Sequence, residues 1–231
     1  MGGSYKMCRA CETKPVYEFT NQRKLCRRCF INWFQKKFLY TIRKFKMIQQ
    51  GDVVGYFGGD HFRFIVLEEM LKIILQKRDI KLVKLPKSKD TLAVLSKKLK
   101  IDSIACPTTC DLGAIYIISE IIKGETNDLI KEAKPVEYLT KTSKFIKPLY
   151  LFLDEEVLLY AKLKKLRFVK AKNVRSSAYP NTLKGIKEGQ DPKTQNVGVK
   201  KDKISMFVDE LEKKHPEVKR AVVNGMLGLG S

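Results

Sequence analysis

Residues 52–59, DVVGYFGG, decide the fold that the sequence predicts. A buried strand of this length that ends in Gly58-Gly59 and leads into a helical pattern over residues 62–77 is typical of a strand–helix unit in a parallel sheet. The same alternation continues downstream, with strands and helices expected in turn over residues 80–85, 90–100, 102–106, 110–123, 145–151, 154–166 and 204–228. The sequence therefore predicts an α/β fold, a parallel sheet with helices on both faces.

The glycine pair also indicates where a ligand would bind. Sheets of this kind bind ligands beyond the carboxyl ends of their strands, and that rim would carry Gly58-Gly59 and the turn from Cys106 to Cys110. A strand, two glycines and a helix form an anion cradle, because backbone N–H groups and the helix N-terminus face the ligand. Taken alone, this pattern is a weak indication of nucleotide binding.

Four of the six cysteines lie upstream of this region in two C-x-x-C pairs. Cys8 and Cys11 are separated from Cys26 and Cys29 by fourteen residues, a spacing that predicts a structural zinc site closed by four thiolates. We therefore expect a zinc module over residues 1–30, in which the metal folds the segment. No apolar signal core or membrane-length apolar run occurs, which predicts a cytoplasmic protein with reduced cysteines.

The charge of the chain indicates the class of its partner. Lys and Arg total 46 against 25 Asp and Glu, a formal net charge of +21, and such an excess usually serves a polyanion. Residues 31–50 predict a basic linker helix, and residues 51–231 an α/β domain with a mobile basic loop near 171–203. Two acid-free segments supply the RNA-binding candidates, which are Arg27, Arg28, Lys36, Lys37, Arg43, Lys44, Lys46, Lys164, Lys165, Arg167, Lys170, Lys172 and Arg175.

Several stretches together resemble a known family. They are LCRRCF at 25–30, TIRKFKMI at 41–48, GDVV at 51–54, IKPLY at 146–150 and MFVDELEKKHPEVK at 206–219. This combination is similar to the PP-loop ATPase-type tRNA 2-thiolation proteins, the TtuA and cytosolic thiouridylase group, over nearly the whole chain. The resemblance implies a PP-loop fold, and ATP-dependent adenylation of a tRNA uridine followed by replacement of its C2 oxygen with sulfur.

Active members of that group carry Ser-Gly-Gly-x-Asp-Ser in the loop, whereas the matching positions here read Phe57, Gly58, Gly59, Asp60, His61 and Phe62. Both glycines remain, but both hydroxyls and the carboxylate are replaced, and Asp60 adds negative charge where phosphates would lie. Two or three lost contacts at about 1.5–3 kcal/mol each amount to several kcal/mol. Gly58, Gly59, Asp60 and His61 thus form a degenerate nucleotide loop, which puts binding of ATP with magnesium in doubt.

The resemblance also implies cysteines that hold an iron–sulfur cluster or activate sulfur in the middle and late chain. The matching segments near residues 85–90 and 168–173 contain none, so an iron–sulfur cluster is not expected. The second zinc module of many members is missing too. In the family's His-Asn-x-Asp turn, which corresponds to residues 106–111, only Asp111 is kept. Cys106, Cys110 and Asp111 are the candidate catalytic residues, although buried cysteines at such turns more often serve packing.

These features predict a tRNA-binding protein of the 2-thiolation pathway. The first hypothesis is a non-catalytic subunit that forms a heterodimer with a catalytic paralogue, with a ubiquitin-like sulfur carrier as a further candidate partner and no membrane partner. One alternative is an active ATP-dependent tRNA 2-thiouridine synthetase that uses the altered loop with Cys106 and Cys110. The other is a zinc-containing nucleic-acid-binding regulator.

Overall fold

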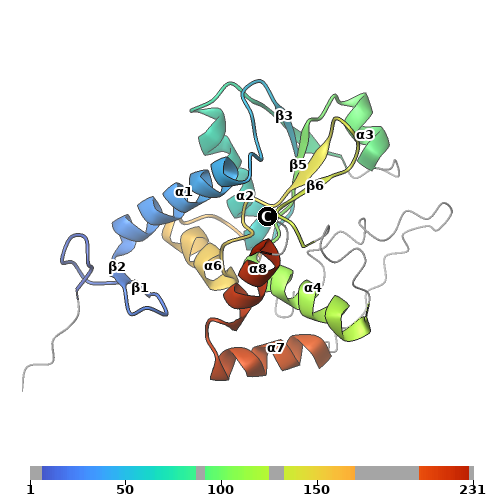
Figure 1. Ribbon diagram of the computed structural model, residues 1–231. Helices are drawn as coiled ribbons and strands as arrows, with labels where there is room; N and C mark the ends of the chain where they lie inside the picture. Colours follow the sequence, from blue (N-terminus) through green and yellow to red (C-terminus); the bar gives the residue numbers. More distant parts are fainter. Residues whose placement is uncertain (1–6, 87–91, 125–132, 170–202, 229–231) are drawn as a thin grey trace, which may run out of the picture.

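A five-stranded sheet forms the centre of the molecule (Figure 1). The structure is a computed structural model that describes residues 7–86, 92–124, 133–169 and 203–228. The strand order is β4-β3-β5-β7-β6. Four strands are parallel, and the edge strand β6 is antiparallel to β7. The strands are β3 (Val53–Phe57), β4 (Lys81–Leu85), β5 (Ser103–Ala105), β6 (Val136–Tyr138) and β7 (Lys144–Ile146).

Seven helices of the described residues surround this sheet. They are α1 (Arg27–Lys44), α2 (Phe62–Leu75), α3 (Leu92–Lys98), α4 (Cys110–Lys123), α6 (Asp154–Leu163), α7 (Lys203–Lys214) and α8 (Val218–Gly228). A small antiparallel pair, β1 (Tyr17–Glu18) and β2 (Lys24–Leu25), precedes α1. The predicted α/β class, a mostly parallel sheet flanked by helices, is confirmed.

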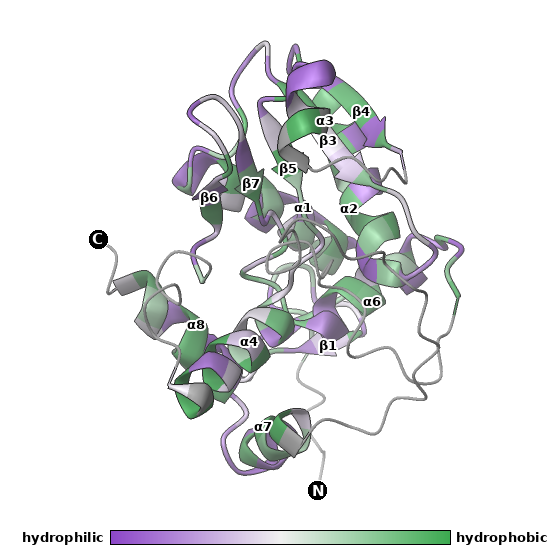
Figure 2. Ribbon diagram, turned by 90° about the vertical axis from the view of Figure 1, so that its right-hand side faces the viewer, coloured by the Kyte–Doolittle hydropathy of each residue, from purple (hydrophilic) through white to green (hydrophobic). Residues whose placement is uncertain are grey.

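The two faces of the sheet bury separate cores, because side chains alternate along a strand. Val54, Ala105 and Ile146 point to the larger core, which also contains buried residues of α1, α2 and α6. Ile104 and Phe145 point to the opposite face. Figure 2 shows α2 as mostly hydrophobic, as expected for a helix that packs between the sheet and α6.

Helix α1 has an apolar face that explains its position. Phe30, Phe34, Phe38 and Ile42 recur at four-residue steps and are all buried. The Phe34 ring stacks on the Tyr160 ring of α6 at a centroid distance of 4.2 Å. The helix runs over 27–44 rather than 31–50, and it ends where Lys46 adopts a positive φ of 48°.

Two further segments differ from the expected boundaries. The strand expected over 145–151 ends at Ile146, just before Lys147-Pro148, because proline lacks the N–H that a ladder needs. The helix expected over 204–228 is divided into α7 and α8 at Pro216. The basic loop expected near 171–203 lies outside the described residues, apart from Lys203 at the start of α7. None of the helices in the described part of the chain is long and apolar enough to cross a bilayer.

Candidate functional site

The four N-terminal cysteines converge on one point. Their Sγ atoms all lie within 4.8 Å of one another. Cys8 and Cys11 are held by a tight turn, in which the N–H of Glu12, at a φ of 54°, donates to the Cys8 carbonyl. Cys26 caps α1 and Cys29 lies in its first turn, so the helix start fixes the second pair. Four thiolates from two rigid turns form a preorganised centre for a soft metal.

The donor chemistry of this centre fits a metal, because only the thiolate form of cysteine coordinates one. A hydrogen bond from the Thr13 hydroxyl, followed by the backbone of Cys29, lowers the pKa of Cys26 to about 6. By contrast, hydrogen bonds to Cys11 and Cys26 raise the pKa of Cys29 to about 12. The four thiols therefore share protons that a bound cation would displace. Four cysteine thiolates bind either a zinc ion or an iron–sulfur cluster. The predicted ligands Cys8, Cys11, Cys26 and Cys29 are thus brought together by the fold.

The cysteine segment is attached to the α/β domain through aromatic contacts and one hydrogen bond. Tyr17 packs edge-on against Phe19 and Phe30, with centroid distances of 4.8 and 5.2 Å. The Tyr17 hydroxyl donates to Oε1 of Glu155, in the first turn of α6, at 2.6 Å. The four-cysteine centre is therefore packed against the domain rather than suspended from a linker.

The glycine loop after β3 lies at the carboxyl end of the sheet, as predicted. A Cβ atom added to Gly58 would come within 2.7 Å of Nζ of Lys84, so the Lys84 side chain lies across this glycine. His61 caps α2, and its Nδ1 accepts a long hydrogen bond of 3.5 Å from the Arg63 N–H. Burial, and then the charge of Arg63, lower the pKa of His61. The Asp60 carbonyl accepts from the Val169 N–H at 2.9 Å, so this loop is tied to the end of α6.

A buried ionic network lies beside this loop, and sequence analysis missed its central residue. Arg63, 3% exposed, binds both carboxylate oxygens of Asp154, with Nε to Oδ1 at 2.7 Å. The Thr109 hydroxyl donates to the same Oδ1 at 2.8 Å. The Asp154 N–H donates to Asp111, which also accepts from Lys219 at 2.7 Å. The signal available in the sequence was a lone arginine within the apolar pattern of residues 62–75.

The three consecutive carboxylates at the start of α6 each bind a different part of the chain. Asp154 binds Arg63 and Glu155 binds Tyr17, as described above. Glu156 is fully buried, with a salt bridge from Arg220 of α8 at 2.7 Å and from Lys37 of α1 at 3.4 Å. It also accepts from the Leu153 N–H at 2.9 Å. One helical turn therefore joins α1, α2, α8 and the cysteine segment.

The candidate catalytic residues are placed in the core. Cys106 is buried with Ile104 and Phe145, whereas Cys110 belongs to the separate cluster between α4 and α8. Desolvation raises the pKa of both thiols to about 12. Both side chains therefore stay protonated at neutral pH, which makes them poor nucleophiles. Asp111 accepts hydrogen bonds from the Asp154 N–H and from the Lys219 ammonium, and burial raises the pKa of Asp111.

The RNA-binding candidates divide into exposed and inward side chains. Lys37 points inward, over the Trp33 and Phe152 rings, and burial lowers its pKa to about 8. The exposed candidates in the described residues are Arg27, Arg28, Lys36, Arg43, Lys44, Lys46, Lys164, Lys165 and Arg167. Lys170, Lys172 and Arg175 lie outside the described residues. The Arg27 guanidinium donates to the Leu163 carbonyl at 2.7 Å, which brings the start of α1 to the end of α6.

The fold and the four-cysteine centre define an α/β protein with a mostly parallel sheet flanked by helices. A solved structure with this architecture is the U34-tRNA thiolase NcsA from Methanococcus maripaludis with its [4Fe-4S] cluster. The two chains are 18% identical with a TM-score of 0.69, and the match covers 96% of this chain and 86% of NcsA. At this identity the likeness shows the fold. No protein-family model and no curated protein sequence matches this chain.

The expectation about cofactors was wrong. An iron–sulfur cluster was not expected, because the matching mid-chain and late segments lack cysteines. A protein of the same fold is nevertheless described with a [4Fe-4S] cluster, and this chain has a four-cysteine centre of suitable donor chemistry. The centre is therefore compatible with zinc or with an iron–sulfur cluster.

Proposed function

We propose that this protein binds tRNA and acts in the 2-thiolation of a tRNA uridine. The observation that carries the proposal is the likeness of almost the whole chain to a U34-tRNA thiolase, at a TM-score of 0.69. The formal net charge of +21 supports an RNA partner independently, because a phosphate backbone is the polyanion that such a charge would serve.

A cationic surface supports the same proposal. We use that name for Arg27, Arg28, Lys164, Lys165 and Arg167. These side chains are exposed, and the hydrogen bond from Arg27 to Leu163 places the two acid-free segments next to each other. Lys164 makes only a long salt bridge to Glu69, at 3.8 Å. Two segments that are more than a hundred residues apart in sequence thus form one surface suited to phosphates.

We further propose that the chain is a non-catalytic subunit, paired with a catalytic paralogue that also receives sulfur from a ubiquitin-like carrier. The loop hydroxyls are replaced by Phe57 and Phe62, and the loop carboxylate is replaced by His61. The thiols of Cys106 and Cys110, with pKa values near 12, favour packing over sulfur transfer. These features support a role in holding tRNA while another chain performs the chemistry.

Gene deletion in the native host tests this function. We expect tRNA to lose 2-thiouridine, and the tagged chain to co-purify with a paralogue that has an intact loop. The purified chain should show no rise in melting temperature at millimolar ATP and magnesium, because a ligand stabilises only the state that it binds. Unchanged thionucleosides would refute the pathway, whereas a clear ATP shift would refute only the non-catalytic role.

The cationic surface gives a quantitative prediction for tRNA affinity. Replacing Lys165 and Arg167 by glutamine should weaken binding and reduce the slope of log K against log salt by roughly one for each lost phosphate contact. The matched control replaces Lys97 and Lys100, two exposed lysines at the end of α3. Lys100, like Lys165, has a positive φ after a helix. Filter binding over a salt series measures the slope for each double variant. Equal changes of slope in the Lys165/Arg167 and Lys97/Lys100 variants would contradict the assignment of this surface.

A further inference from the structure

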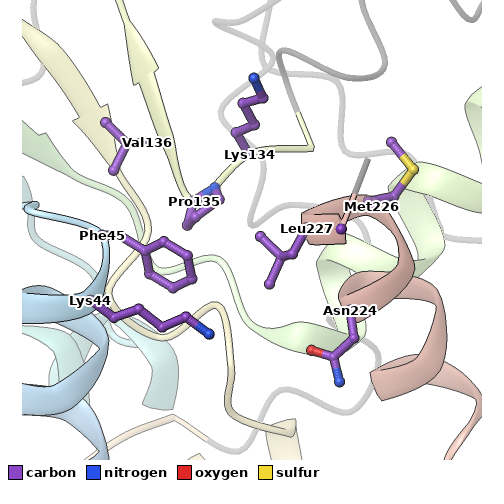
Figure 3. A pocket seen from close by; sticks show the side chains of 9 residues that line it. Lys44, Phe45, Lys134, Pro135, Val136, Asn224, Met226 and Leu227 are labelled. Carbon is purple, nitrogen blue, oxygen red and sulfur yellow. The ribbon is translucent and has the colours of Figure 1, made fainter. Parts of the chain in front are cut away.

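A pocket that the proposed function does not use lies between the end of α1, the start of β6 and the end of α8 (Figure 3). Its volume is about 620 Å³, within the range of roughly 300–1,000 Å³ typical of small-molecule sites. Figure 3 shows the Phe45 ring and the Leu227 side chain facing each other, with Pro135 above the ring and Lys44 and Asn224 below.

The chemistry of the pocket is an apolar interior with a cationic edge. Phe45, Pro135 and Leu227 supply aromatic and aliphatic surface. The Lys44 ammonium lies 5.4 Å from the centroid of the Phe45 ring. None of the described residues that line the pocket is acidic. A flat apolar group with an attached anion matches this combination, because the ring offers a stacking surface and the lysine a counter-charge.

Two hydrogen bonds hold the backbone of two walls of the pocket, the end of α1 and the start of β6. The Lys144 ammonium donates to the Lys46 carbonyl at 3.0 Å, which holds the end of α1 against β7. The Lys147 N–H donates to the Pro135 carbonyl at 2.9 Å, which fixes the strand start. Walls held in this way lose less conformational entropy on binding than walls that must first be ordered.

We propose that this pocket binds one unpaired nucleotide of an RNA, with the base stacked on Phe45 and its phosphate at Lys44. The proposal rests on the RNA-binding function proposed above. Helix α1 has 18 residues, so it separates the pocket from the cationic surface by about 27 Å. A folded RNA can reach both ends of such a helix, whereas a free nucleotide could use only the pocket.

Replacement of the ring tests the pocket directly. In filter binding with unfractionated tRNA, Phe45→Leu in the full chain should weaken binding about five- to one-hundred-fold, as expected for one stacked base. Phe45→Trp, which keeps an aromatic face, should retain the affinity. Phe207→Leu is the matched control, because Phe207 is 48% exposed on α7 and does not line the pocket. Ultraviolet crosslinking should join tRNA to the peptide that contains Phe45 in the wild-type chain.

The outcomes separate this proposal from the proposed function. Unchanged tRNA affinity in Phe45→Leu, with no crosslink near Phe45, would overturn the pocket proposal but leave tRNA binding intact. Failure of the wild-type chain to bind tRNA at all would overturn both. Lys44 is exposed, so Lys44→Gln should affect folding little, and it should reproduce part of the loss of tRNA affinity. If adenosine monophosphate alone displaced the crosslink at micromolar concentration, the occupant would be a free nucleotide, and the RNA assignment would be wrong.

Discussion

Replacing Arg63 by methionine is expected to lower the free energy of unfolding by about 3–5 kcal/mol, the range found when one partner of a buried ion pair is removed. The Arg63 side chain is 3% exposed and Asp154 is 25% exposed, so the remaining carboxylate would be partly hydrated and the loss should fall near the lower end of this range. The Thr109 hydroxyl would be its main remaining side-chain donor. Urea denaturation followed by circular dichroism measures the change.

Two further variants separate the ion pair from the loss of a long side chain. Lys72→Met removes an exposed partner of Glu68 on the same helix, at an i,i+4 spacing, and should cost less than about 0.5 kcal/mol. Arg63→Met combined with Asp154→Leu should recover much of the loss, because no unpaired charge then remains buried. Equal destabilisation by Arg63→Met and Lys72→Met would show that the network beside the glycine loop contributes no more to stability than an exposed ion pair.

Replacing Cys26 by serine is expected to abolish metal binding at the four-cysteine centre. Structural four-ligand sites bind zinc with roughly 10–16 kcal/mol in small peptides, so the loss of one thiolate removes a large part of the energy that folds the segment. Between residues 7 and 26, the part of this segment that the structure describes, there are two strands of two residues each. We therefore expect it to become sensitive to proteases while the α/β domain stays folded. Elemental analysis of anaerobically purified protein measures zinc and iron.

Cys110→Ala provides the control for this measurement, because Cys110 is a buried cysteine outside the centre. This variant should retain the metal content of the wild-type chain. Visible absorption together with iron and sulfide would assign an iron–sulfur cluster, whereas zinc alone would assign a single-ion site. Full metal content in Cys26→Ser would contradict the assignment of Cys26 as a ligand.

The parts of the fold that the sequence predicted well are those with local signals. The run from Val53 to Gly59 identified β3 and the turn after it, and Gly124, with a φ of 74°, ends α4 where expected. The four cysteines were found because their spacing is itself the signal. Strand β6 was missed, since three residues at a sheet edge form no recognisable period.

The parts that could not be predicted depend on contacts between distant segments. The pattern of cationic and apolar residues along α1 does not reveal that Lys37 faces Glu156, 119 residues away. Neither does it reveal that Phe45 lines a pocket with residues of β6 and α8. Arg63 was missed because its partner, Asp154, is 91 residues away and cannot be inferred from the neighbouring sequence. The expectation of no iron–sulfur cluster was wrong because a C-x-x-C spacing is shared by zinc sites and iron–sulfur centres.

The contacts of the first turn of α6 affect how the molecule unfolds. Its three carboxylates bind Arg63, Tyr17, and the pair Lys37 and Arg220, so four segments share one anchoring turn. The ion pairs of this turn with α1, α2 and α8 favour unfolding of these helices as one cooperative unit. The cysteine segment is linked to the same turn by the Tyr17 hydroxyl, so it can open locally while the helices stay packed. An insertion of one residue before α6 would disrupt all of these contacts together.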